Sequence, residues 1–359
     1  WSWASSNARI PQVSNVVVAV SAPVPHALIE VTVSDGDVRY GSTVVHEGPI
    51  DSRILRVGNV HVPLSATSMA QVEERRAAEC VVTVSDGGGT VLARVRRSVE
   101  IQPRDLWLWV GDPRRGGATG AAQVSGTREL SRSLLAPFVR PNHREVALVA
   151  REAADQLETA TGDSSFCAFQ IPDVAEAERR VDSSVDAIYR ALVARKISYS
   201  EPPPGWDYGC EGQRIRDHGD VARGGLGTCM DTTVLMAAVI EQVGLFPVLV
   251  LVPGHIFIGY WRRNPHSGLR GAEWYPDVPV VFDESTISTL VEGGFLGLIE
   301  TTTFTVGKET PPGRARVSAR EALRAAVEDS DATLIDVVAA RRAGVAPLPA
   351  VTQRADGVT

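Results

Sequence analysis

Lysine is almost absent from this chain of 359 residues. Of its 36 Lys and Arg residues, only Lys196 and Lys308 are lysine, and the rest are arginine. The formal net charge is −7. Binding along a nucleic-acid backbone depends on clustered positive charge. No direct nucleic-acid binding is therefore predicted. The excess of Arg, Ala, Val and Gly is typical of a high-GC bacterial genome and carries no mechanistic meaning.

Long apolar runs are also missing from the chain. No stretch approaches the roughly 18 residues that a membrane-spanning helix needs, so no membrane contact is predicted. The first residues lack the basic start and apolar core of a signal peptide. Since the chain does not begin with Met, we expect it to be a piece of a longer protein.

Closely spaced cysteines are a third absence. The cysteines lie far apart and form no Cys-x-x-Cys pair: Cys80, Cys167, Cys210 and Cys229. At this chain length, such spacing predicts neither a zinc site nor a disulfide scaffold. A reducing, cytoplasmic setting fits this pattern, and neither a metal nor another cofactor is predicted.

The first part of the chain contains short β-branched runs that end at turn signals. The sequence V-T-V-S-D-G occurs at 31–36, and V-T-V-S-D-G occurs again at 82–87. Asp-Gly after such a run indicates a hairpin turn. Several short strands at this spacing predict an immunoglobulin-like β-sandwich domain over 1–110. The Gly-rich stretch 111–127 is interpreted as a linker.

From residue 128 the apolar period becomes helical. Two amphipathic helices are predicted first, around 146–157 and 181–192. The elements predicted after them are, in order, a helix at 229–243, strands at 248–252 and 255–261, a helix near 285–291 and a strand at 298–305. This order predicts an α+β domain over 128–349, with an antiparallel sheet packed against the helix that begins at Cys229. The residues 350–359 are interpreted as a tail.

The helix that begins at Cys229 carries the strongest chemical signal. Its apolar residues recur every three or four positions, Gly244 follows its end, and Pro247 prevents its continuation. The glycines within 224–227 let the backbone approach a substrate closely. A helix N-terminus favours the thiolate, which is the reactive form of cysteine, and the Cys229 N–H is placed to stabilise an oxyanion. Cys229 is therefore the candidate nucleophile.

His255 is the candidate base, because it begins a predicted strand directly after a Pro-Gly turn. A third group would fix the tautomer of the imidazole, as an Asp does in Ser-His-Asp sites. Two acids compete for this position, Glu300 and Asp283. Glu300 is flanked by apolar residues, so burying it without a partner would be costly, and this favours it over Asp283.

Each of these residues also has an interpretation without chemistry. A lone cysteine in an apolar helix usually fills a core. The other cysteines lack the helix-start setting and are interpreted in this way. Asp217, Asp220 and Asp231 near the motif would either select a basic substrate or form a solvated rim, and we favour the rim.

The residues around Cys229 resemble the core of transglutaminase-like domains. The matching stretches are Gly227-Thr228-Cys229-Met230-Asp231, a helix that ends in Gly244-Leu245-Phe246-Pro247, Gly254-His255-Ile256-Phe257, and Ile299-Glu300-Thr301-Thr302. This resemblance implies a papain-like fold with a triad of Cys229, His255 and Glu300. It supports Glu300 over Asp283, although the family more often has Asp at this position.

A closer similarity is to a bacterial subgroup found in large multidomain proteins that often carry helicase modules. It rests on three further stretches, 135–143, 212–216 and 336–349, so the resemblance covers most of 105–349. Papain-like enzymes often complete the oxyanion hole with a Gln side chain upstream of the cysteine. The resemblance assigns Gln213 to that role here.

Together these residues predict thiol-dependent acyl transfer on an amide bond of a protein or peptide, through a thioester. Release by water gives a cysteine peptidase or amidase, which we favour because water is the more abundant acceptor. Release by an amine gives a protein-crosslinking transglutaminase. The alternative class is a non-catalytic module that binds a peptide or docks other parts of a larger, helicase-associated bacterial assembly.

Overall fold

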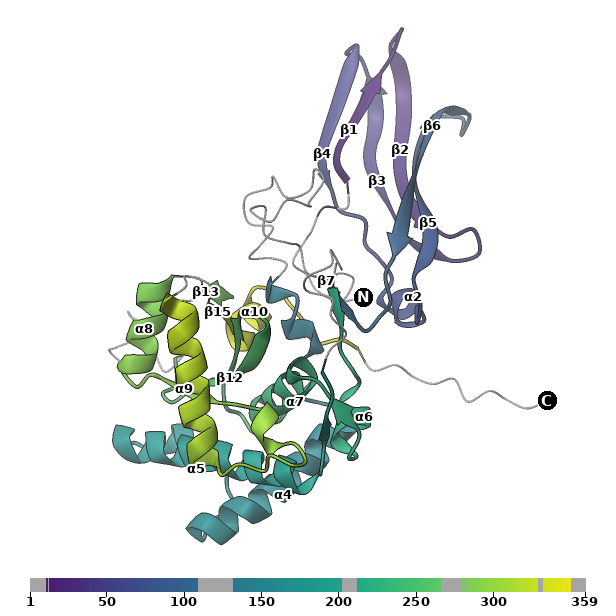
Figure 1. Ribbon diagram of the computed structural model, residues 1–359. Helices are drawn as coiled ribbons and strands as arrows, with labels where there is room; N and C mark the ends of the chain where they lie inside the picture. The colour runs from purple at the N-terminus through teal and green to yellow at the C-terminus, as the bar shows by residue number, and fades with distance from the viewer. Residues whose placement is uncertain are drawn as a thin grey trace, which may run out of the picture. The chain divides into compact units, whose positions relative to one another are not determined.

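The computed structural model describes residues 11, 13–108, 132–201, 212–265, 279–281, 283–328 and 332–349. The contacts between residues divide the chain into two compact units (Figure 1). The first unit comprises Trp1–Leu106 and Pro349–Thr359, and the second comprises Trp107–Leu348. The sequence predicts the end of the first domain at residue 110. The predicted linker at 111–127 and the predicted tail at 350–359 lie outside the described residues.

The first unit contains two antiparallel sheets that share an apolar core. One sheet has the strand order β3-β2-β5-β6, and the other pairs β1 with β4. The core joins Ile29 and Val84 of the larger sheet to Val18 and Leu55 of the smaller one. The elements of this unit are β1 (Val13–Ala19), β2 (Val24–Ser34), β3 (Arg39–Ile50), β4 (Ile54–Val60), α2 (Ala66–Ala70), β5 (Arg76–Asp86) and β6 (Val91–Ile101).

Both predicted hairpin turns of this unit are confirmed. The first joins the antiparallel pair β2 and β3, and the second joins β5 and β6. In the first turn, Asp35 Oδ1 accepts a hydrogen bond from the Val38 N–H at 2.8 Å. In the second, Asp86 Oδ1 accepts one from the Gly88 N–H at 2.9 Å. The aspartate side chains thus stabilise the turns that the S-D-G signals predict.

The second unit is built on a five-stranded antiparallel sheet with the order β13-β15-β11-β12-β14. Helices precede, interrupt and follow these strands, so the predicted α+β class is confirmed. The strands of the sheet are β11 (Pro247–Val252), β12 (His255–Trp261), β13 (Val280–Val281), β14 (Leu296–Ile299) and β15 (Thr333–Asp336). The other elements of the unit are β7 (Leu106–Leu108), η3 (Ala136–Phe138), α4 (Arg144–Thr161), η4 (Ala168–Gln170), α5 (Val174–Ala194), β8 (Ser198–Tyr199), β9 (Gly212–Arg214), α6 (His218–Ala222), β10 (Leu226–Gly227), α7 (Cys229–Gln242), α8 (Glu284–Glu292), η6 (Thr302–Phe304), α9 (Pro312–Glu328) and α10 (Val337–Arg342).

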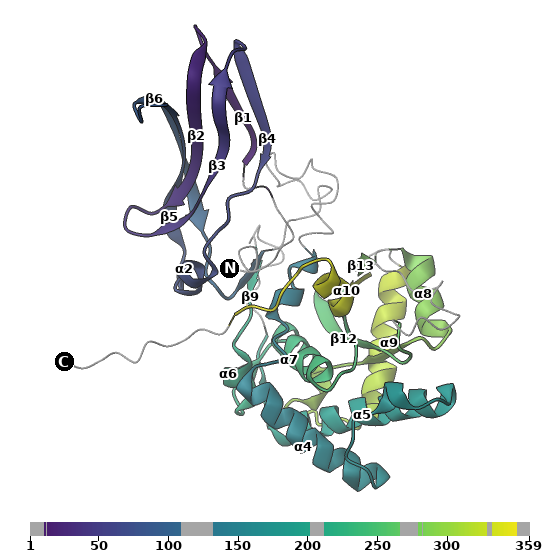
Figure 2. The same ribbon diagram turned by 180° about the vertical axis from the view of Figure 1, so that it is seen from behind.

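Helices cover both faces of the five-stranded sheet (Figures 1 and 2). Val248, Val250 and Phe257 point to one face, where they pack against apolar residues of α8 and α9. Alternate residues of a strand point to opposite faces. On the opposite face α7 packs against β11 and β12, with α4 and α5 on its far side.

The central helix forms where the sequence predicts it. Every residue from Cys229 to Ile240 is buried, so α7 is a core helix that is apolar nearly all round. It ends at Gln242, and Gly244 adopts the left-handed conformation with φ 79°. That conformation is common just beyond a helix end and favours glycine.

The predicted strand at 298–305 is wrong beyond Ile299. There β14 ends, and the 3-10 turn η6 follows. The physical reason is local, because Glu300 Oε1 accepts hydrogen bonds from both the N–H and the hydroxyl of Thr302, at 2.9 Å each. Bonds between residues two positions apart bend the chain, and an extended strand does not allow them.

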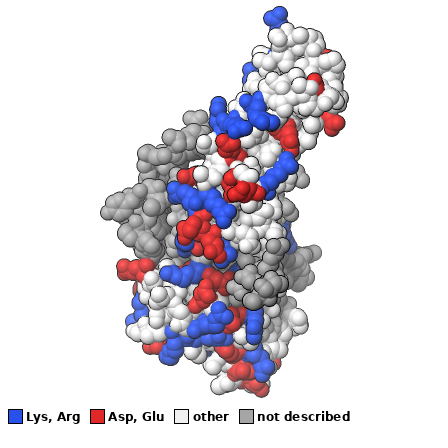
Figure 3. All heavy atoms as spheres, turned by 90° about the vertical axis from the view of Figure 1, so that its right-hand side faces the viewer, with Lys and Arg blue, Asp and Glu red and all other residues white. Residues whose placement is uncertain are grey.

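Charged side chains of both signs are intermixed over the described residues of the face that Figure 3 shows. Many of them form ion pairs, such as Arg195 with Glu152 at 2.7 Å. No described helix has the length and apolarity needed to cross a membrane.

Candidate active site

Cys229 is the first residue of α7, and the cap of that helix fixes its backbone. Thr228 Oγ1 accepts a hydrogen bond from the Asp231 N–H at 3.2 Å, and Asp231 Oδ2 accepts one from the Thr228 N–H at 2.9 Å. This reciprocal pair is a capping box. Cys229 itself is only 3% exposed. Within the described chain the N–H groups of Cys229 and Met230 donate to no partner, as is usual in a first turn, so they are available to an anion.

His255 is the first residue of β12, and it bridges the cysteine and an acid. Its side chain is hydrogen-bonded to Glu300, and the Cys229 side chain lies near enough to act on the charge of the imidazole. The distance from His255 Nε2 to Glu300 Oε2 is 2.7 Å, which leaves Nδ1 for the thiol. The His255 side chain is 28% exposed and that of Glu300 is 7% exposed. Solvent therefore reaches the imidazole but hardly touches the carboxylate.

Glu300 directly follows β14 and is held by the turn that it helps to form. Its N–H donates to the Ala315 carbonyl at 3.1 Å, which ties the turn to α9. Its Oε1 is bonded twice by Thr302, while Oε2 is bonded to His255. Both carboxylate oxygens thus have partners, as a buried charge requires.

Asp283, the other candidate acid, is exposed and caps α8 instead. Its carboxylate accepts hydrogen bonds from the Thr286 N–H at 2.7 Å and from the Ser285 hydroxyl at 2.8 Å. These bonds account for its position at a helix start. The acid that lies beside His255 is Glu300.

The charges of the three residues support one another. Burial on its own would lower the pKa of His255, but hydrogen bonds and charges from Cys229 and Glu300 outweigh it and raise that pKa to about 10. Burial opposes ionisation of Glu300, yet His255 and Thr302 hold the pKa of its carboxyl below the usual value. At neutral pH the imidazole is therefore protonated and the carboxyl is ionised. An imidazolium beside a cysteine favours the thiolate.

Gln213 lies on β9, next to the first turn of α7. Its Nε2 is 3.3 Å from Thr228 Oγ1, the hydroxyl that caps α7. Its Oε1 is buried and has no hydrogen-bond partner. The side chain is thus brought to the residue before Cys229 with one polar group unsatisfied, which is uncommon in a protein interior.

Nothing in the sequence pointed to Tyr199, whose phenol on the short strand β8 lies near enough to Cys229 to interact with its charge. That strand runs parallel to β10, and Tyr199 lies opposite Gly227 in the pair. Burial raises the pKa of Tyr199 to about 12, and the charge of Cys229 acts in the same direction. The phenol therefore keeps its proton at neutral pH. The ring centre is 4.7 Å from Lys308 Nζ, within the range of a cation–π contact.

A buried threonine cluster connects the three elements that carry the site. Thr301, in the turn after β14, has its Oγ1 3.1 Å from that of Thr232 and 2.9 Å from that of Thr233, both on α7. Thr233 Oγ1 is also 3.2 Å from the carbonyl of Ile256 on β12. No sequence pattern brings these hydroxyls together, because Thr301 is far along the chain from Thr232 and Thr233.

The acidic residues near Cys229 do not form one solvated rim. Asp231 is fully buried, and besides capping α7 it pairs with Arg216 at 2.7 Å. Asp217 caps α6 and pairs with Arg140. Asp220 is mostly exposed. The prediction of a solvated rim is wrong for Asp231. At the third position of a buried helix, a carboxylate can accept a hydrogen bond from the N–H of the residue that caps the helix, and Asp231 does so instead of facing solvent.

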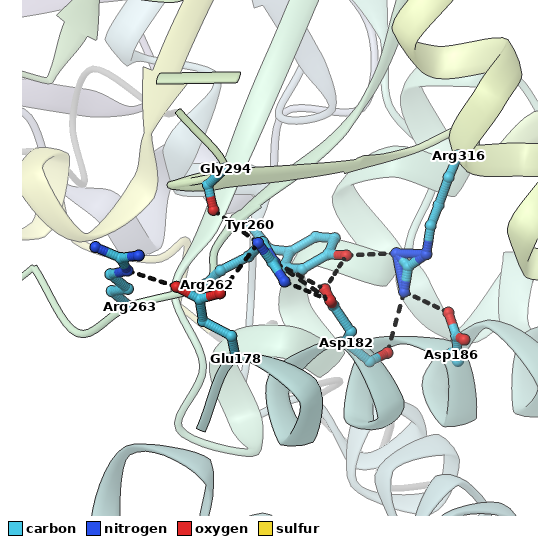
Figure 4. Close-up of polar contacts among 8 residues, drawn as sticks. All are labelled: Glu178, Asp182, Asp186, Tyr260, Arg262, Arg263, Gly294 and Arg316. Carbon is cyan, nitrogen blue, oxygen red and sulfur yellow. Dashed lines mark hydrogen bonds and ion pairs between the residues drawn. The ribbon is translucent and has the colours of Figure 1, made fainter. Parts of the chain in front are cut away.

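The end of β12 opposite His255 is held by a polar network (Figure 4). The Tyr260 hydroxyl donates to Asp182 Oδ1 of α5 at 2.8 Å and accepts a hydrogen bond from Arg316 of α9. Arg262, just beyond the strand, pairs with Asp182 at 3.0 Å. Two further ion pairs extend the network, Arg263 with Glu178 and Arg316 with Asp186. The strand that begins at His255 is thereby fixed to α5 and α9.

Of the other cysteines, Cys80 and Cys167 are half-buried free thiols, and Cys210 lies outside the described residues. Among the described residues no three His, Cys, Asp or Glu side chains are grouped as a metal would need. Comparison of the chain with protein-family models, with curated proteins and with solved structures gives no match. The similarity to transglutaminase-like domains stays a prediction.

Proposed function

We propose that this chain performs thiol-dependent acyl transfer on an amide bond, as a cysteine peptidase or amidase. The observation that carries the proposal is the 2.7 Å pair of His255 Nε2 and Glu300 Oε2, with the Cys229 side chain acting on the charge of the same imidazole. The proposal includes a papain-like core of the transglutaminase type. Its support is the packing of α7, which begins at Cys229, against the antiparallel strand that begins at His255.

In the proposed reaction the Cys229 thiolate attacks the amide carbonyl carbon, and a C–S bond forms as the carbonyl electrons move to oxygen. His255 gives its Nδ1 proton to the departing nitrogen, the C–N bond breaks, and a thioester remains. The neutral imidazole then takes a proton from water as its oxygen attacks the thioester. The C–S bond breaks, the acid leaves, and the thiolate–imidazolium pair is restored. Glu300 keeps the imidazole oriented throughout.

The Gln213 amide is the proposed side-chain donor to the oxyanion, together with the Cys229 N–H. When Nε2 faces Thr228, both the Thr228 hydroxyl proton and Gln213 Oε1 lack a partner among the described residues. Turning the amide by half a rotation satisfies both, because the hydroxyl then donates to Oε1. The same rotation frees both N–H groups of Nε2. The position that Nε2 then takes is itself buried, so its N–H groups lack a partner in the free chain, and an oxyanion would supply one.

The acceptor is proposed to be water, which makes the products an acid and an amine or ammonia. The substrate is a protein or peptide that carries the amide. A reducing, cytoplasmic setting belongs to the same proposal, because the reaction needs a free thiol and the described cysteines are free. Other domains or subunits of a larger bacterial assembly are proposed as partners on the sequence similarity alone.

Selective alkylation tests the proposal. The full chain is treated with iodoacetamide between pH 5 and 9, and the labelling rate of each cysteine is followed by peptide mass mapping. At pH 6 an ordinary thiol with a pKa of about 8.5 is only about 0.3% thiolate. An imidazolium-paired Cys229 should react at least about tenfold faster than Cys80 or Cys167 at this pH, and His255→Ala should abolish the advantage.

The control variant is Cys167→Ala, which removes a half-buried thiol outside the site and should leave the Cys229 rate unchanged. Cys229→Ala should remove the fast-reacting thiol entirely. If Cys229 is inert, or reacts no faster than the other cysteines, the catalytic proposal is wrong. The non-catalytic alternative, a peptide-binding or docking module, would then be the better one.

A further inference from the structure

β10 leads directly into Cys229, and one side of it is bonded to β8. The Ser198 N–H donates to the Gly225 carbonyl at 3.0 Å, and the Ser200 N–H donates to the Gly227 carbonyl at 2.9 Å. In a parallel ladder, residues whose groups face the neighbouring strand alternate with residues whose groups face away. Leu226 lies between the two bonded glycines. Its N–H and C=O therefore point away from β8.

Among the described residues these two groups form an unpaired sheet edge. Neither has a hydrogen-bond partner within the part of the chain that the structure describes. The other side of β8 is occupied, because the Val306 N–H donates to the Ile197 carbonyl at 2.8 Å. Leu226 is also 52% exposed, although it is apolar. An unpaired edge of this kind can accept an additional strand.

The edge is held in place by the glycines on either side of Leu226. A Cβ on Gly225 would lie 2.0 Å from the Asp220 carbonyl oxygen of α6. A Cβ on Gly227 would lie 3.2 Å from side-chain atoms of Thr232 and Val221. Both glycines are thus packed closely against neighbouring helices, and the Leu226 peptide groups are fixed before any ligand arrives. Groups that are already fixed lose little entropy when they bind.

We propose that the Leu226 N–H and C=O bind the main chain of an extended peptide, the acyl donor of the proposed reaction. Leu226 is three residues before Cys229, so their Cα atoms are at most about 11 Å apart, the span of three extended residues. A peptide whose carbonyl lies at the thiol is therefore long enough to pair with this edge. Such pairing recognises the backbone and tolerates many side chains. The inference rests on the proposed function and adds the substrate class, a peptide in β conformation.

The test uses acetyl-Ala-Ala chloromethyl ketone, which alkylates a thiolate with loss of chloride, and two analogues that carry a methyl group on one or the other Ala nitrogen. A methyl group removes one donor from the peptide without changing the reacting carbon. In the wild-type chain we expect one of the two analogues to label Cys229 about three- to tenfold more slowly than the parent. That range corresponds to one net hydrogen bond.

Leu226→Pro makes the matching change in the protein. Proline is tolerated on an edge strand where the N–H faces outward, and the variant removes the donor of Leu226 together with its exposed side chain. It should label with the parent peptide reagent about three- to tenfold more slowly than wild type, while its iodoacetamide rate stays within about twofold. Leu226→Ala, which keeps the N–H, should retain the sensitivity to N-methylation.

The outcomes separate this inference from the proposed function. If iodoacetamide labels wild-type Cys229 rapidly but all three peptide reagents react alike, the edge does not bind the peptide and the inference fails alone. If iodoacetamide labels Cys229 no faster than an ordinary thiol, the proposed function fails and the inference falls with it. Should Leu226→Pro misfold, the N-methylated reagents on the wild-type chain decide the question.

Discussion

At the residue scale, the protonation of His255 depends on its two neighbours. A histidine in water loses its proton near pH 6.5, whereas Cys229 and Glu300 raise the pKa of His255 to about 10. Removing the charge of either neighbour should return this pKa toward its usual value. The effect is measurable both in the reactivity of the thiol and in the stability of the fold.

Glu300→Gln removes the negative charge while keeping the shape of the side chain. We expect iodoacetamide labelling of Cys229 at pH 8 to fall by about two- to fourfold, because a His255 pKa returned toward 6.5 leaves the imidazole mostly neutral at that pH and removes its hold on the thiolate. Asp283→Asn is the matched control. Asn caps a helix as well as Asp does, so this variant should keep the wild-type rate. A wild-type pH profile for Glu300→Gln would remove Glu300 from the site.

The raised pKa of His255 also predicts how stability changes with pH. Because the folded state holds the proton more tightly than the unfolded state, the contribution is complete below about pH 6.5 and is lost as pH rises toward 10. Up to about pH 8.5 the unfolded chain keeps the thiol proton that Cys229 lacks in the proposed thiolate–imidazolium pair, so the two proton differences cancel. Urea unfolding between pH 9 and 10 should therefore show wild type losing stability relative to His255→Gln, by up to about 1.4 kcal/mol per pH unit. Parallel curves for the two proteins would mean that His255 is not charged in this range.

The sequence predicted those candidate site residues whose surroundings can be inferred from their neighbours along the chain. The cost of burying a carboxylate between apolar neighbours was enough to prefer Glu300 to Asp283. Tyr199 was missed because a two-residue strand has no period to detect, and its place near Cys229 depends on the pairing of β8 with residues 226–227. Asp231 was misjudged because its burial follows from the packing of α7, which the sequence of the motif does not reveal.

At the element scale, the site depends on how α7, β12 and the turn after β14 are joined. The hydroxyls of Thr232, Thr233 and Thr301 take part in more hydrogen bonds than they have protons to donate. Besides its contact with Thr301, Thr232 lies 2.9 Å from the Thr228 carbonyl, and Thr233 bonds the carbonyl of Ile256. A hydroxyl donates one proton and accepts two. The cluster therefore holds the three elements together through shared donors, with Thr301 in the middle.

Thr301→Val tests this connection, because valine fills the same volume without a hydroxyl. We expect the free energy of unfolding to fall by about 1–3 kcal/mol, the cost of leaving buried polar groups unsatisfied. Thr301→Ser keeps the hydroxyl and should recover most of the Cys229 labelling rate that Thr301→Val loses. If valine and serine give the same labelling rate, the cluster contributes to packing only.

Long elements were predictable and short ones were not. The helix Cys229–Gln242 and the strand His255–Trp261 follow from apolar pattern and from Gly and Pro at their ends. The end of β14 was not predictable, because it is set by hydrogen bonds from Thr302 to the Glu300 carboxylate. A side chain that bonds its own backbone nearby overrides the extended pattern.

At the scale of the whole molecule, the chain consists of two units with separate cores. All candidate site residues lie in the unit Trp107–Leu348. We expect a chain limited to 107–348 to unfold cooperatively and to label at Cys229 as the full chain does, because a unit with its own core can fold alone. Thermal unfolding and the iodoacetamide rate check this. Loss of folding would show that the first unit supplies part of the stability of the second.

The polar network at the end of β12 also acts across the unit. Asp182, Tyr260 and Arg316 come from α5, β12 and α9, which are distant in sequence (Figure 4). The alternation of residues that predicted the strand indicates which face of the sheet Tyr260 points to, but it indicates no hydrogen-bond partner for the phenol. Its partners follow only from how α5 and α9 pack in the fold, which is why no sequence pattern indicated the network.

The scarcity of lysine has a practical consequence for experiments on this protein. An amine-reactive dye has only Lys196, Lys308 and the chain terminus to modify. Lys196 is ion-paired with Glu309 at 3.0 Å, whereas the exposed Lys308 ammonium lies over Tyr199, which itself lies near Cys229. In a Lys196→Arg background with the chain terminus blocked, a single fluorophore on Lys308 would sit near Tyr199 and report by its emission when a peptide occupies the site.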